Sequence, residues 1–110
     1  MQRTLDHAIP ADLPTATAKR LTALCRAVWT AEVTGAGRQR WPRYFTADAA
    51  ADARYTRVRI QAAIARRDGS ASRAVVRLVW AGTDPSGTYL DGRTATVHFT
   101  REGETWNPAR

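Results

Sequence analysis

The sequence predicts an α+β fold in which a long N-terminal helix packs across a curved, four-stranded antiparallel meander. Two features carry this prediction. Apolar residues recur at helical spacing over residues 16–34, and from residue 55 they alternate along runs that short turns separate. Short turns between consecutive strands require antiparallel pairing. Because a meander alone cannot bury its apolar face, we expect the helix to cover it.

Length and composition are those of one globular domain. The chain has 110 residues, of which 44% are hydrophobic and 25% are charged, and these values exclude a disordered tail. Residues 1–14 contain two prolines and no periodicity, so we expect an irregular lead-in followed by one domain over residues 15–110. No stretch has the apolar length of a membrane span or of a signal peptide. As written, the chain predicts a cytoplasmic protein; it would be extracytoplasmic as a trimmed piece of an exported or anchored protein.

The helix is expected over residues 16–34. Thr15 and Thr17 are candidate N-caps, and Gly35 is a natural C-cap because glycine readily adopts the left-handed conformation. An aromatic cluster at residues 41–45 and a short helix at residues 46–53 are expected before the sheet begins. The apolar stripe of the long helix consists of Ala18, Leu21, Leu24, Cys25, Val28 and Trp29.

Alternation of apolar and polar residues defines the strands. The first strand begins near Tyr55, a turn at residues 68–70 leads into the second, and the third bends at Asp91-Gly92. A short strand around Trp106 closes the sheet. In the first strand, Val58, Ile60, Ala62 and Ile64 are expected on one face and Arg57, Arg59, Gln61 and Ala63 on the other. The core-facing residues of the later strands are expected to be Ala74, Val76, Leu78, Trp80, Ala95, Val97 and Phe99.

The chain is strongly basic, with a net charge of +7 and a pI of about 11.0. Its arginines are scattered rather than gathered into a block, and a GC-rich coding sequence would enrich arginine and alanine alike. One local pattern differs, because it places an aromatic ring among cations. This pattern keeps a nucleic-acid contact as an alternative function. Its residues are Arg38, Arg40, Trp41 and Arg43.

The sequence contains no motif for a cofactor, a metal or covalent catalysis. Cys25 is the single cysteine, so neither a disulfide within the chain nor a paired-cysteine metal site can form. On the apolar stripe it is expected to be a buried, inert thiol. His98 lies between Val97 and Phe99, so its side chain is expected on the opposite face of the strand, at a surface or interface. We therefore expect no catalytic residue, no metal and no cofactor.

Residues 90–106 read LDGRTATVHFTREGETW: an Asp-Gly bend, an alternating strand, a glycine turn and a closing tryptophan strand. This ending resembles the last hairpin of the nuclear transport factor two-like, or cystatin-like, α+β superfamily. The long helix and the aromatic segment stand where that superfamily has its first helices, so the resemblance covers residues 16–107. Within the superfamily, the chain looks most like small actinobacterial accessory domains and the soluble domains of conjugation or secretion assembly proteins. The resemblance implies a non-enzymatic domain that dimerises or docks a partner.

The resemblance also implies an alternative, because enzymes of the superfamily resembling ketosteroid isomerases and dehydratases act inside a cone-shaped pocket. A small-molecule binder, lyase or isomerase needs such a pocket to be open and to hold a polar group. In this chain the pocket would be lined by Trp29, Tyr44, Phe45, Trp80 and Phe99.

The face of the sheet opposite the helix gives the preferred functional hypothesis. Its expected members are Arg57, Arg59, Ala63, Arg73, Val75, Arg77, Val79, Thr94, Thr96 and His98. A rim of arginine and threonine around a small apolar centre suits a protein–protein contact. We therefore expect an association domain that forms a homodimer or docks a protein partner. The expected interface residues are Arg57, Arg59, Ala63, Val75, Arg77, Val79 and His98.

Overall fold

The computed structural model describes residues 2, 11–45 and 55–110. Its elements are the helix α2 (Thr15–Thr34), the 3-10 helix η1 (Arg38–Arg40) and the strands β1 (Thr56–Asp68), β2 (Ser70–Thr83), β3 (Tyr89–Glu102) and β4 (Thr105–Ala109). The short helix predicted at residues 46–53 lies outside the described residues. In the part of the chain that the structure describes, no helix combines the length and apolar character needed to cross a membrane.

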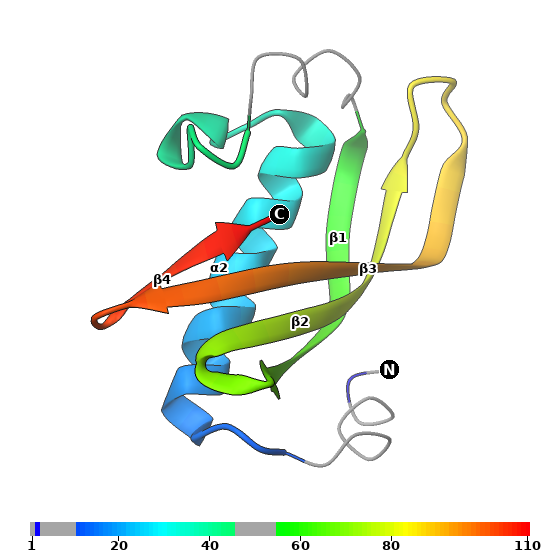
Figure 1. The fold of residues 1–110 in the computed structure, drawn as a ribbon. Coiled ribbons are helices and arrows are strands. Elements are labelled where there is room, and N and C mark those ends of the chain that lie inside the picture. The colour runs from blue at the N-terminus through cyan, green and yellow to red at the C-terminus, as the bar shows by residue number, and fades with distance from the viewer. Residues whose placement is uncertain (1, 3–10, 46–54) are drawn as a thin grey trace.

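The four strands form one antiparallel sheet in the order β1-β2-β3-β4. In Figure 1, α2 lies behind the sheet, and β3 crosses in front of the helix. The helix packs mainly against β1 and covers one face of the sheet. The predicted α+β architecture, a long helix against a four-stranded antiparallel meander, is confirmed.

The helix α2 forms where the periodicity predicted it, and its buried residues are Leu21, Cys25, Val28, Ala31 and Val33. Gly35 ends the helix in the left-handed conformation at φ 86, and its N–H donates to the Ala31 carbonyl at 2.9 Å. The predicted threonine cap is wrong. The helix already includes Thr15, so the capping position falls on Pro14, whose side chain cannot accept a hydrogen bond.

The core lies between α2 and the sheet. Its largest fully buried side chains are those of Phe99, Leu21 and Leu78. The rings of Trp29 and Trp80 meet edge-on, with centroids 5.5 Å apart. Within the described ranges no polar or charged residue is buried. From the sheet, the core includes Ala63, Ala65, Ala74, Val76, Leu78, Trp80, Val97, Phe99 and Trp106.

A β-bulge interrupts β1 in the middle of the strand. Ile60 pairs with Trp80, but Ala62 pairs with Val79, so Gln61 is an extra residue on β1. Because side chains alternate with a period of two, one extra residue exchanges the two faces of the strand beyond it.

The bulge overturns part of the predicted alternation. Ala63 and Ala65 pack into the core under α2. The prediction that Ala63 lies on the opposite face of the sheet, as an interface residue, is therefore wrong. Ala62 and Ile64, which were expected in the core, belong to that opposite face instead.

A second bulge lies on β3. Trp80 pairs with Arg93 but Gly82 pairs with Leu90, so the extra residue falls at the predicted Asp91-Gly92 bend. Gln61 Nε2 donates to Asp91 Oδ1 at 2.7 Å. This hydrogen bond joins the two bulges across β2.

Candidate functional site

The outer face is the side of the sheet opposite α2. The pairing registers place on it Ala62 and Ile64 from β1, Arg73, Val75, Arg77 and Val79 from β2, and Thr94, Thr96 and His98 from β3. The two valines are half-buried, and the arginines, threonines and histidine are exposed. Apart from Ala62 and Ile64, which the bulge contributes, these residues were all predicted to lie here.

The centre of the outer face is a row on β2. Val79 pairs with Ala62 on one side and Thr94 on the other, and Arg77 lies next along the row. Ile64, opposite Arg77, is only 2% exposed, so the accessible apolar atoms of the face belong mainly to Val79 and its neighbour Val75.

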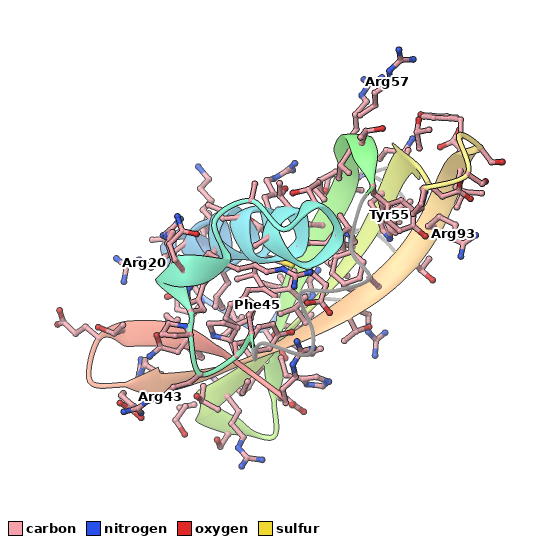
Figure 2. The ribbon with its side chains drawn as sticks, turned by 90° about the horizontal axis from the view of Figure 1, so that it is seen from above. Arg20, Arg43, Phe45, Tyr55, Arg57 and Arg93 are labelled. Atoms are coloured by element: carbon pink, nitrogen blue, oxygen red, sulfur yellow. The ribbon has the colours of Figure 1, made fainter. Side chains whose placement is uncertain are left out.

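The two arginines at the start of β1 that were predicted on the outer face lie in different places. Arg59 pairs with Ala81, which lies outside the core cluster on the outer side. Arg57 has a left-handed φ of 53 and falls in a register irregularity between Thr56 and Arg59. Figure 2 shows Arg57 pointing away from the body of the molecule. Its predicted place on the face is therefore wrong, because the irregular backbone turns it outward.

His98 has a partner that sequence reasoning missed. Its Nδ1 lies 3.5 Å from Asp68 Oδ2, and both side chains are about half exposed, at 56% and 47%. Asp68 was interpreted only as a turn residue. The antiparallel register brings the β1–β2 turn beside the end of β3, and no local pattern indicates this contact.

The five side chains predicted to line a cone all belong to the core cluster or pack against it. Phe45, Trp80 and Phe99 are buried in the core cluster, and Trp29 and Tyr44 pack against it. The rings of Tyr44 and Phe45 meet edge-on at 4.8 Å. Trp29 Nε1 is buried and has no hydrogen-bond partner in the described part of the chain. Burial raises the pKa of the Tyr44 hydroxyl.

Cys25 is buried on α2, and burial raises the pKa of its thiol to about 12, against the smaller opposing effect of Arg26. A protonated, enclosed thiol is a poor nucleophile. Across residues 2, 11–45 and 55–110, no three His, Cys, Asp or Glu side chains gather closely enough to hold a metal ion.

Of the four residues in the predicted arginine–tryptophan pattern, Arg38 has a structural role. Its Nε and Nη2 donate to the carbonyls of Ala31 and Glu32, each at 2.7 Å. Its guanidinium also lies 5.2 Å from the centre of the Phe45 ring. Arg38 therefore caps the end of α2 and ties it to the aromatic segment.

The other three residues form a surface. The Arg40 guanidinium lies 4.5 Å from the centre of the Trp41 ring. Both residues, with Arg43, line a cavity of about 370 Å³. Its opposite wall comes from the β3–β4 hairpin, through Thr100, Glu102, Asn107 and Pro108. One wall comes from residues 40–44 and the other from residues 100–108, far apart in the sequence, so sequence reasoning found only one of them.

Arg110 was also missed. Its guanidinium lies 3.9 Å from the centre of the Tyr44 ring, and its Nη2 lies 3.4 Å from Glu32 Oε2. The chain end thereby joins the aromatic segment to α2.

Comparisons of the chain with protein-family models, with curated proteins and with solved structures gave no match.

Proposed function

We propose that this domain acts by association, in which two copies bind each other through their outer faces. The observation that carries the proposal is the row Val75, Arg77 and Val79 on β2. Half-buried valines alternate there with an exposed arginine, on a face that α2 does not cover. A purely solvated face would carry polar residues at these positions. A small apolar centre inside a polar rim is the composition of a protein–protein contact.

The β1 edge of the sheet is poorly suited to pairing with another chain, which favours contact through the face. Two of its backbone N–H groups are occupied by side chains: Ala63 N donates to Gln2 Oε1 at 2.7 Å, and Arg67 N donates to Asp12 Oδ1 at 2.8 Å. Side chains that occupy an edge block strand addition.

Charge would set the orientation of the two copies. The outer face carries Arg73 and Arg77, while Asp68 stands at the β1–β2 turn and Asp91 at the β3 bulge, toward opposite ends of the sheet. A two-fold axis makes every contact occur twice. An arrangement that sets the arginines of one copy against these carboxylates of the other avoids like-charge repulsion and selects one orientation.

The size of the outer face predicts a weak dimer. At about 3.3 Å per residue, β2 from Arg73 to Val79 is about 20 Å long, and three strands with their side chains are about 15 Å wide. The resulting area of about 300 Å² is well below the roughly 800 Å² per partner of a standard interface. We therefore expect a weak, reversible dimer.

Sedimentation velocity over a range of protein concentrations tests this proposal. The variants Val79→Glu and Val75→Glu place a carboxylate at the centre of the contact, where it would lose its hydration. Each variant is expected to remain monomeric at concentrations where the wild type dimerises, with an unchanged far-UV circular dichroism spectrum.

Ala16→Glu is the matched control, because it adds the same charge at an exposed position in the first turn of α2, away from the sheet. It should dimerise like the wild type. A wild-type chain that stays monomeric at high micromolar concentration contradicts the proposal, and so does an Ala16→Glu variant that loses the dimer as completely as Val79→Glu.

A further inference from the structure

Arg40 and Trp41 form a ridge between two surface hollows. Both residues line the cavity of about 370 Å³ next to the β3–β4 hairpin. Both also line a cavity of about 430 Å³ on the other side, which reaches Ala23 and Thr30 on α2 and Gly37 just before η1. The ridge and its two hollows together make a groove from the helix to the hairpin, called the Arg40–Trp41 groove below.

Two of the cations that line this groove have no carboxylate partner among the described residues, whereas a third, Arg26, donates to the Ile60 carbonyl at 3.3 Å. Arg40 and Arg43 are exposed, and neither forms an ion pair with another residue in the described ranges. Two other arginines are instead engaged. Arg38 donates to backbone carbonyls at the end of α2, and Arg110 pairs with the Glu32 carboxylate. The groove therefore offers two guanidinium groups to an anion from outside. Guanidinium groups bind phosphate oxygens in a bidentate manner.

The aromatic surface in the groove is held in place. Trp41 N donates to the Arg38 carbonyl at 3.0 Å, and the Trp41 carbonyl accepts from Phe45 N at 3.0 Å. Its ring contacts the Phe45 ring with centroids 6.3 Å apart. A planar group entering either hollow meets the Trp41 ring or the guanidinium stacked on it. Nucleobases stack on both kinds of surface.

The wall formed by the hairpin adds hydrogen-bonding groups. Thr100 and Asn107 offer donors and acceptors, and Glu102 offers only acceptors. A carboxylate repels phosphate, but it accepts hydrogen bonds from exocyclic amino groups of bases. The groove thus has two chemically different walls. The wall at Arg40 and Arg43 is cationic, and the wall at the hairpin can form hydrogen bonds with the edges of bases.

We propose that the Arg40–Trp41 groove binds single-stranded nucleic acid, with phosphates on Arg40 and Arg43 and a base against Trp41. A single strand is favoured over a duplex because only unstacked bases can enter hollows of this size and present their faces to the ring. An acidic peptide would use the arginines but leave the aromatic surface without a role. This role goes beyond association through the outer face and can hold whether or not the domain dimerises.

Fluorescence anisotropy with a fluorescein-labelled oligodeoxycytidylate, whose bases carry an exocyclic amino group, tests the proposal at about 50 mM salt. The double variant Arg40→Ala/Arg43→Ala is expected to bind about tenfold more weakly or worse. Loss of two phosphate contacts should also reduce the slope of log affinity against log salt by about 1.4, at about 0.7 for each contact to a single strand.

The matched control is Arg57→Gly/Arg93→Ala, which removes the same charge elsewhere. Figure 2 shows Arg43 beside the β3–β4 hairpin and Arg57 and Arg93 toward the other end of the molecule. Glycine is chosen at position 57 because the backbone there is left-handed, at φ 53. This control should change affinity less than about twofold, if phosphate contacts at the groove rather than net charge carry binding.

The aromatic contribution is tested with Trp41→Phe and Trp41→Leu, each checked for folding by circular dichroism. The phenylalanine variant should keep most of the affinity and the leucine variant should lose it. Equal losses in the two arginine double variants overturn the proposal. Competition by a duplex, or by a phosphorylated peptide, as effective as that by the unlabelled oligodeoxycytidylate also overturns it. The Arg40→Ala/Arg43→Ala variant should lose nucleic-acid binding while its sedimentation profile stays that of the wild type. This result would show that the groove and the outer face act independently.

Discussion

The two faces of the same sheet are built on different principles. Toward α2, neighbouring strands place Val76, Leu78 and Phe99, each at most 2% exposed, in a core without polar side chains among the described residues. On the outer face, the residues between them in sequence are exposed or half-buried, such as Arg77 and His98. Successive positions of β2 and β3 therefore differ in environment: the side chains toward α2 are buried in the core, and those on the outer face stay at the surface.

The largest expected effect contrasts neighbouring residues on the two faces. Phe99→Ala removes a fully buried ring and should lower the free energy of unfolding by about 3–5 kcal/mol. His98→Ala, one residue away on the outer face, should change it by less than about 0.5 kcal/mol. Urea denaturation measures both values. Similar losses in the two variants would remove the distinction between the faces.

A second prediction concerns the inner face and pH. The pKa of Cys25 is raised from 9.0 to about 12 by burial, so the thiol stays protonated in the folded chain and ionises first in the unfolded chain. Its contribution to stability is therefore complete below pH 9 and is lost as the pH rises toward 12. The expected loss is about 1.4 kcal/mol for each pH unit in that range. The difference in unfolding free energy between wild type and Cys25→Ala should shrink accordingly, whereas a constant difference contradicts a buried neutral thiol.

The smallest expected effect concerns the bulge at Gln61, which exchanges the two faces of β1. The hydrogen bond from Gln61 to Asp91 joins the two bulges. A double-mutant cycle with Gln61→Ala and Asp91→Ala should give a coupling energy of about 1 kcal/mol in urea denaturation. A coupling near zero would mean that backbone pairing alone holds the bulges in register.

Much of the fold follows from local patterns in the sequence. The helix Thr15–Thr34 differs by one residue from the predicted range, because apolar spacing and Gly35 define it locally. The alternation failed at Gln61, since a bulge depends on how two strands pair. The small residues Ala62 and Ala63 fit either face, so the pattern gave no sign of the exchange that moved Ile64 to the outer face.

The candidate sites were less predictable because they depend on contacts between distant segments. Arg38 stands in the same local pattern as Arg40, yet its guanidinium bonds the end of α2 rather than facing outward. The wall that Thr100 and Asn107 add to the Arg40–Trp41 groove exists only after the hairpin has docked beside the aromatic segment. The pattern in each segment identifies its own residues, but it does not show that two distant segments come into contact in the fold.

A dilution series of ¹⁵N-resolved NMR spectra tests directly whether two copies of the domain bind each other through the outer face. On concentration, the amide signals of Val75, Arg77, Val79 and Thr96 should shift together, while those of buried α2 residues such as Leu21 stay in place. Shifts confined to another surface, or spectra that do not change with concentration, would contradict this mode of association.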